Sequence, residues 1–154
     1  MSVGERVQPN LLKWRVAAAF WMALIFALSS SLFAPSLSYD ATLDFFGVVN
    51  YVVRKCAHSV EFGILTLFCF RALHPKPYPF DRARIWAALV SLAYAASDEF
   101  HQSFVPLRSG KATDVLFDAA GILAIAYVIG RVNRDASDIH RAQFLGSPPK
   151  PNGR

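Results

Sequence analysis

Apolar residues fall into four long runs along this chain, and polar residues gather at the ends of the runs. The runs cover residues 14–33, 56–73, 85–100 and 113–130. A helix of about 20 apolar residues is long enough to cross the hydrocarbon core of a bilayer. The first run could instead be a signal peptide, because a basic segment precedes it and small residues follow. It is long for a signal-peptide core and no clean cleavage site follows, so we expect a retained span.

The segments between the runs complete the predicted architecture. Residues 43–53 have the broad apolar spacing of a helix that lies at the membrane surface or leads directly into the second span. Three prolines within residues 74–79 predict a turn between the second and third spans. We therefore expect an all-α, polytopic membrane protein, a bundle of four transmembrane helices with a short interfacial helix before the second span. Residues 14–130 form this membrane domain, residues 1–13 a polar N-terminus, and residues 131–154 a polar tail that is predicted to be disordered.

Composition supports a membrane location over a water-soluble domain. The chain is 54% hydrophobic and only 18% charged, which is too apolar for a small soluble protein. A basic pI of about 9.5 raises the possibility of nucleic acid as a partner. The basic residues stand in short clusters between apolar runs, however, and not along one polar face, so we expect membrane lipids and no nucleic acid. Cys56 and Cys69 lie about 20 Å apart on one predicted helix and cannot form a disulfide.

The distribution of basic residues predicts the orientation of the four spans. Most of the sixteen basic residues fall on one side, and the exceptions are Arg54, Lys55, Arg108 and Lys111. The positive-inside rule then places both termini in the cytoplasm. It follows that the polar ends of the second, third and fourth spans all face the extracytoplasmic side.

Three polar stripes occupy these outward ends, each on one helical face. They are Lys55, His58 and Glu61; Asp98, His101 and Gln102; and Asp114, Asp118 and Gly121. Each residue taken alone has an ordinary structural explanation, such as a snorkelling lysine, a hydrogen-bonded histidine or a helix N-cap. Three stripes at one membrane depth favour a shared polar pocket over a purely structural ion-pair network. Gly121 would let another helix approach closely.

The sequence favours a metal site or a nucleophilic serine less than it favours the polar pocket. Nitrogen and oxygen ligands are available in His58, Glu61, Asp98, Glu99 and His101. There is no HExxH motif, no cysteine is near the histidines with a zinc spacing, and Lys55 and Arg108 would repel a cation. We therefore predict no metal and no cofactor. Ser59, Ser97 and Ser103 lie near acids and histidines, but no nucleophile-elbow motif surrounds them.

Three segments together resemble the VanZ-like family of small bacterial membrane proteins. They are residues 54–65 (RKCAHSVEFGIL), 97–108 (SDEFHQSFVPLR) and 114–121 (DVLFDAAG), and the order and spacing agree from about residue 14 to residue 130. The resemblance implies a four-span protein of the bacterial cytoplasmic membrane. The family takes its name from a protein that raises resistance to the glycopeptide teicoplanin. One departure is Asp118, where the family more often has asparagine.

These observations lead to one functional expectation and its alternatives. The expected pocket binds, or acts on, an anionic lipid or a lipid-linked envelope precursor at the extracytoplasmic face. Residues suited to proton transfer are His58, Glu61, Asp98 and His101. Residues suited to substrate binding are Lys55, Glu99, Gln102, Arg108, Asp114 and Asp118.

The alternatives use the same residues differently. In one, the protein is a non-catalytic envelope component, and the polar cluster locks the bundle or binds a partner. In another it is a proton-coupled carrier, which the small number of spans and the lack of an internal repeat disfavour. The sequence leaves open whether the protein is an enzyme, which ligand it binds and its oligomeric state.

Overall fold

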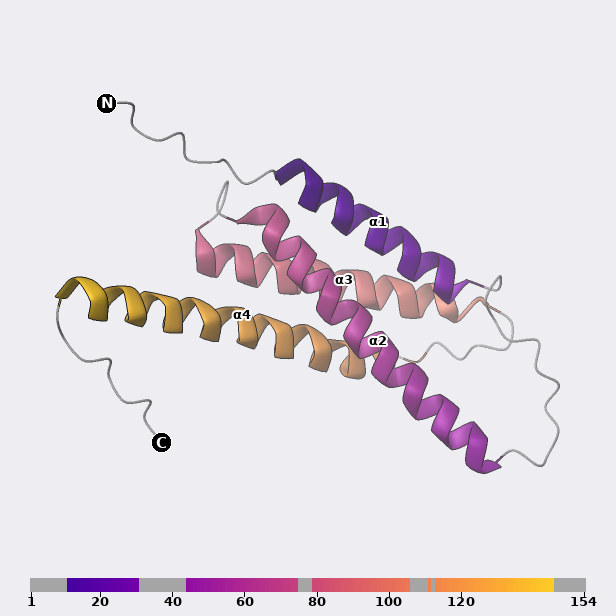
Figure 1. Ribbon diagram of the computed structural model, residues 1–154. Helices are drawn as coiled ribbons and strands as arrows, with labels where there is room; N and C mark the ends of the chain where they lie inside the picture. The colour runs from indigo at the N-terminus through magenta and orange to yellow at the C-terminus, as the bar shows by residue number, and fades with distance from the viewer. Residues whose placement is uncertain (1–10, 31–43, 75–78, 106–110, 112, 146–154) are drawn as a thin grey trace.

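Every regular element in the described part of the chain is a helix. The structure is a computed structural model, and it describes residues 11–30, 44–74, 79–105, 111 and 113–145. The helices are α1 (Leu11–Ser29), α2 (Asp44–Leu73), α3 (Phe80–Gln102) and α4 (Asp114–Leu145), as Figure 1 shows. The all-α prediction is therefore confirmed.

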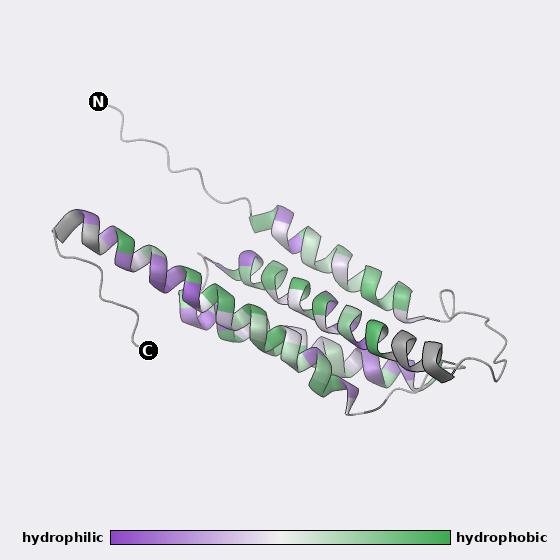
Figure 2. Ribbon diagram, turned by 60° about the horizontal axis from the view of Figure 1, so that its bottom comes forward, coloured by the Kyte–Doolittle hydropathy of each residue, from purple (hydrophilic) through white to green (hydrophobic). Residues whose placement is uncertain are grey.

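Three of the four helices are long and apolar enough to cross a membrane. They are α1, the Lys55–Leu73 part of α2 and the Asp114–His140 part of α4. Their outer surfaces carry large apolar side chains such as Phe20, Val60 and Leu123, each at least 60% exposed. Figure 2 shows this apolar colouring over the middle of the bundle. Surfaces of this kind suit lipid, because soluble monomers rarely expose contiguous apolar areas of such extent.

Helix α3 has a polar residue at each end of a short apolar middle. Its 23 residues would span about 35 Å, which is enough to cross a bilayer. The uncharged part, residues 85–97, covers only about 20 Å of a hydrocarbon core that is about 30 Å thick. If α3 crosses the membrane, the acids at its C-terminal end must therefore be shielded from lipid by the other helices.

Two helices run beyond the apolar runs of the sequence. Asp44–Leu73 is a single helix, so residues 44–53 lead directly into α2, which is one of the two arrangements that the sequence allowed, and do not form a separate interfacial helix. No proline interrupts this stretch, and a glycine costs only about 1 kcal/mol in a helix. At the other end, α4 passes Gly130, where the sequence predicted a disordered tail, and continues to Leu145. No proline or further glycine occurs before Gly146, and this last part of α4 extends beyond the bundle (Figure 1).

Helix α2 is the central helix and contacts all three others. Its residues Phe62, Leu65 and Thr66 have no exposed surface. Helix α3 presents small side chains every four residues at Ala83, Ala87, Ser91 and Ala95, all fully buried. Small residues at this spacing let helices pack closely, which is a common way to hold membrane helices together.

Two side-chain hydrogen bonds fix α1 to the rest of the bundle. The indole of Trp21 donates to the carbonyl oxygen of Glu61 on α2 at 2.9 Å. The hydroxyl of Tyr94 on α3 donates to the carbonyl oxygen of Met22 at 2.6 Å. The two bonds involve adjacent residues of α1 and reach two different helices, and so they help to set the register of α1.

Helices α2 and α4 approach closely at Gly121, as the sequence predicted. A Cβ atom on Gly121 would overlap the main chain of Ser59. The Ser59 hydroxyl donates to the carbonyl oxygen of Phe117 at 2.7 Å, one turn before Gly121. Gly63 continues the contact, since its Cβ position lies 3.0 Å from Ile125 and 3.3 Å from the carbonyl oxygen of Gly121.

We expect Gly121→Ala to destabilise the bundle, because its methyl group meets backbone atoms that cannot rotate away. Overpacking of this kind costs about 1–3 kcal/mol. The matched control is Gly130→Ala on the same helix, where the methyl group meets only the mobile guanidinium end of Arg84. Unfolding of both variants in detergent micelles measures the difference. Equal stability of the two variants would show that the α2–α4 contact is looser than described.

Candidate functional site

Buried polar side chains from all four helices meet at one end of the bundle. Five of them come from the C-terminal end of α3 and the N-terminal end of α4. Each is at most 4% exposed: Asp98, Glu99, Gln102, Asp114 and Asp118. Helix α1 adds Ser29, which is 1% exposed, and the first half of α2 adds Lys55 and His58. We call these eight residues the polar cluster.

An ion pair joins α2 to α4 and α3. The Nζ atom of Lys55 lies 2.5 Å from Oδ2 of Asp114 and 3.9 Å from Oε1 of Glu99. The other oxygen of Glu99 accepts a hydrogen bond from the backbone N–H of Lys111 at 3.2 Å. The Lys55 side chain is 15% exposed, so its ammonium group is largely withdrawn from solvent and depends on these carboxylates.

A second set of hydrogen bonds joins α1 to α3. Oδ2 of Asp98 accepts from the Ser29 hydroxyl at 2.9 Å and from the Gln102 amide at 2.7 Å. The same amide lies 3.2 Å from the Ser29 oxygen, which closes a three-residue network. Gln102 follows Asp98 by one helical turn, and this spacing lets it reach the carboxylate.

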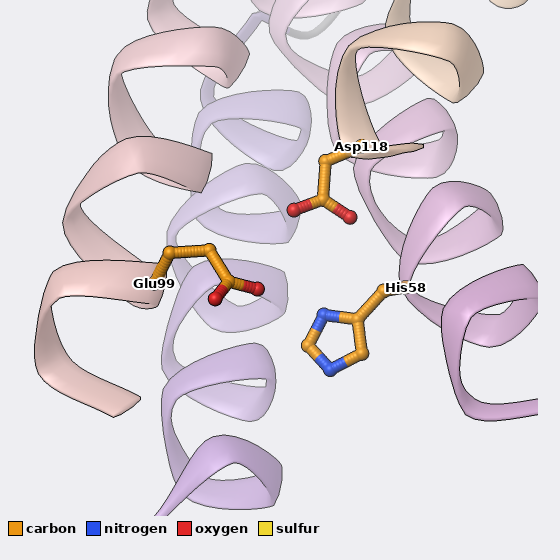
Figure 3. Close-up of side chains that lie close together, drawn as sticks. All are labelled: His58, Glu99 and Asp118. Atoms are coloured by element: carbon orange, nitrogen blue, oxygen red, sulfur yellow. The ribbon is translucent and has the colours of Figure 1, made fainter. Parts of the chain in front are cut away.

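A third group consists of His58, Glu99 and Asp118, one from each of α2, α3 and α4. Each offers one nitrogen or oxygen atom, and these three atoms lie within 4.8 Å of one another. Figure 3 shows the three side chains pointing toward a common space. Asp118 is 1% exposed, and its Oδ2 atom has no hydrogen-bond partner among the described residues.

Negative charge exceeds positive charge inside the polar cluster. Four carboxyl groups stand there, and Lys55 is the one described lysine or arginine within ion-pair distance of any of them. Four carboxylates around one ammonium group would repel each other strongly where solvation is poor. The arrangement therefore favours protons or a further cation among these groups.

Seven of the ten residues singled out from the sequence meet in this cluster. The seven are Lys55, His58, Asp98, Glu99, Gln102, Asp114 and Asp118. His101 lies against α1, where its ring centroid is 4.5 Å from that of Phe26. Glu61 is half-buried on α2, and its carbonyl oxygen accepts the Trp21 bond. Arg108 lies outside the described residues.

Sequence reasoning missed Ser29. It was grouped with Ser30 and Ser31 as the small-residue end of the first apolar run, and a serine there has no distinctive signal. Its partner Asp98 lies 69 residues further along the chain. The one available hint was its position at the polar end of an apolar helix, level with the other polar stripes.

The chain matches the family model described as VanZ/LLP1 over residues 14–133. It belongs to the VanZ/LLP1 family. The matched range contains the whole polar cluster, and it confirms the resemblance found in the three sequence segments. Comparisons with the curated proteins and with the solved structures gave no match. Membership of the VanZ/LLP1 family, together with the apolar helices, identifies an integral membrane protein.

We expect Lys55→Met to destabilise this VanZ/LLP1-family chain strongly, because Asp114 and Glu99 lose their ammonium partner. Removing one partner of a buried ion pair costs about 3–5 kcal/mol. The control is Arg84→Met, which breaks the pair that Arg84 forms with Asp81 at 3.0 Å. That aspartate is 76% exposed, so the loss should be about 0–1 kcal/mol. Unfolding in detergent measures both variants.

The double variant Lys55→Met, Asp114→Asn removes the ammonium together with the charge it meets most closely. We expect it to recover part of the stability lost in Lys55→Met. If the two single variants at Lys55 and Arg84 lose equal stability, the Lys55 pair does not hold the helices together.

Proposed function

We propose that the polar cluster forms a site at the extracytoplasmic face that binds, or acts on, an anionic lipid or lipid-linked envelope precursor. One observation carries the proposal. Five polar residues that are at most 4% exposed gather at one end of a bundle whose outer surface carries many large apolar side chains. Ionisable groups in such surroundings are costly, and membrane proteins that keep them commonly use them for ligands or proton transfer.

An amphiphilic ligand fits the surroundings of the cluster. Large apolar side chains next to it are 49–72% exposed: Phe100, Phe104, Leu116 and Phe117. Phe100 follows Glu99 directly, Leu116 and Phe117 precede Asp118 on the same turn of α4, and Phe104 lies just after the end of α3. A ligand with its head group at the cluster would then have apolar surface for its acyl or isoprenoid chain.

Positive charge for an anionic head group must come from more than Lys55, which Asp114 already pairs. Two further basic residues, Arg108 and Lys111, stand in the segment between α3 and α4. An arginine offers a planar fork that binds phosphate or carboxylate with two parallel hydrogen bonds. We propose Arg108 as this clamp, with Lys55 as a second, weaker point charge.

Proton transfer is the role proposed for His58 if the protein is an enzyme. The imidazole lies beside Glu99 and Asp118, either of which could orient it. A histidine next to a carboxylate is a common general acid–base pair. Turnover of a lipid substrate by the purified protein would separate an enzyme from a binding protein.

The second candidate is a non-catalytic envelope component with a structural polar network. The Ser29, Asp98 and Gln102 bonds favour it, because they connect α1 to α3 and leave the Gln102 amide well satisfied. This candidate predicts that the cluster can be replaced by apolar residues as a unit without loss of function.

Native extraction followed by mass spectrometry tests lipid binding. We expect an anionic lipid or lipid-linked precursor to co-purify above its level in the surrounding membrane. Arg108→Lys should lose this enrichment at least about tenfold, since a hydrogen bond to a charged group contributes about 1.5–3 kcal/mol. Arg84→Lys makes the same chemical change near the start of α3, at the other end of the helix, and should leave the enrichment intact.

Two results would count against this function. Lipid composition identical to the bulk membrane would favour the structural candidate. Equal enrichment in Arg108→Lys and Arg84→Lys would exclude bidentate recognition by Arg108.

Topology has a separate test. Four spans with both termini in the cytoplasm require residue 76 to lie inside and residue 111 outside. In a background that lacks Cys56 and Cys69, we expect an impermeant thiol reagent to label Lys111→Cys in intact cells and not Lys76→Cys. Labelling of both positions from outside would overturn the four-span arrangement.

A further inference from the structure

His58, Glu99 and Asp118 have the donor set and the spacing of an incipient metal site. One imidazole nitrogen and two carboxylate oxygens lie within 4.8 Å of one another. Three helices contribute one ligand each, and all three side chains point inward (Figure 3). We propose that these three residues bind a divalent transition-metal ion, Zn²⁺ or Mn²⁺.

The donor atoms fit such an ion better than they fit Mg²⁺ or a thiophilic metal. Imidazole nitrogen suits zinc, iron, nickel and copper ions, whereas carboxylate oxygen suits magnesium, calcium and manganese ions. A set with one nitrogen and two oxygen atoms therefore suits Zn²⁺ or Mn²⁺. Oxygen and nitrogen atoms around a tetrahedral Zn²⁺ lie about 3.4 Å apart. Donors spread over as much as 4.8 Å therefore need only small side-chain rotations to close around the ion.

A buried oxygen atom of Asp118 is the independent observation that points to a ligand. Asp118 is 1% exposed, and its Oδ2 atom accepts no hydrogen bond from any described residue. Buried polar atoms are normally satisfied, so an orphaned carboxylate oxygen needs a reason. Coordination of a cation would satisfy it, and would also reduce the repulsion between Asp118 and Glu99.

Repulsion from Lys55 was one of the arguments against a metal that the sequence provided, beside Arg108 and the lack of a metal motif, and the structure weakens the part that concerns Lys55. The Lys55 ammonium lies closer to Asp114, at 2.5 Å, than to Glu99, at 3.9 Å. Its charge is therefore matched mainly by a carboxylate that is not a metal ligand here. Asp98 and Asp114 remain as further negative charge in the cluster, which favours a divalent ion over none.

The ion would also complete the site proposed above. Where the proposed function holds, a metal with three protein ligands and an open position can bind one oxygen of an anionic head group. This link to a lipid depends on the proposed function, whereas metal binding itself does not. The two are tested by separate measurements.

Metal content and affinity of the full-length protein test the site. The protein is purified in detergent in a background that lacks Cys56 and Cys69, so that thiols cannot bind zinc. After treatment with a chelator, it is titrated with Zn²⁺ alone and, in a second series, with Mn²⁺ alone. We expect one ion per chain and X-ray absorption that reports nitrogen and oxygen ligands including one imidazole.

Matched variants separate a site from a general attraction of cations to acids. Asp118→Asn removes a ligand and a charge, whereas Asp98→Asn removes the same charge from a residue held by Ser29 and Gln102. We expect Asp118→Asn to weaken Zn²⁺ binding at least about tenfold more than Asp98→Asn. His58→Gln, which removes no carboxylate, should weaken binding as much as Asp118→Asn does and remove the imidazole signal.

Three results would overturn the metal site. They are the lack of stoichiometric binding of either ion, equal losses in Asp98→Asn and Asp118→Asn, and unchanged affinity in His58→Gln. Unfolding of each variant without metal shows whether it is folded; if Asp118→Asn is not, His58→Gln decides the question. Stoichiometric metal without lipid enrichment would keep this inference and reject the proposed function.

Discussion

Lipid cannot solvate charged side chains, and the rest of this structure depends on that constraint. The acids at the C-terminal end of α3 stand after an apolar middle of about 20 Å, so if α3 crosses the membrane they do not reach beyond a hydrocarbon core that is about 30 Å thick. They are therefore turned inward, where Asp98 meets Ser29 and Gln102, and Glu99 meets Lys55. The contacts with Ser29 and Lys55 reach α1 and α2, so the solvation requirement of one helix end determines where its neighbours must lie. The same requirement explains why α3 is the least apolar helix and yet has fully buried positions along its length.

The close approach of α2 and α4 gives the cluster its geometry. Gly121 brings the main chain of α4 against that of Ser59, and a hydrogen bond from Ser59 to Phe117 fixes the register one turn earlier. His58 precedes Ser59 and Asp118 follows Phe117, so the two side chains are presented to each other by residues that have no charge. A bulkier residue at position 121 would separate the helices, and the donor atoms of His58 and Asp118 would move apart with them. The α2–α4 contact therefore determines both how the two helices pack and how close the donor atoms of the site lie.

Much of this arrangement could be predicted from the sequence because the signals are local. Apolar runs predicted the helices, and i, i+3, i+4 spacing predicted that Asp98 and Gln102 share a face. The limits of α2 and α4 were less predictable, since a change in polarity at residues 54 and 131 does not end a helix unless a proline or cap does. Contacts between residues on different helices were the hardest to predict from the sequence. No spacing rule relates Ser29 to Asp98, or His58 to Asp118, and only tertiary packing brings such distant positions together. A metal motif built on three helices is for the same reason invisible to a search for short ligand spacings.

Asp118 is the residue at which these considerations meet. Sequence resemblance gives asparagine more often at this position, and an asparagine could donate a hydrogen bond to Glu99 without adding charge. Aspartate cannot donate when ionised, and it stands within reach of Glu99 and His58 in a cluster where carboxylates already outnumber Lys55. A change from amide to carboxylate in such a place raises the demand for a proton or a cation. Since the carboxylate is 1% exposed, bulk solvent cannot meet that demand. Cation affinity at the α2–α3–α4 junction would then be a property of this chain in particular, added to a polar cluster in which Ser29, Asp98 and Gln102 are already joined by hydrogen bonds.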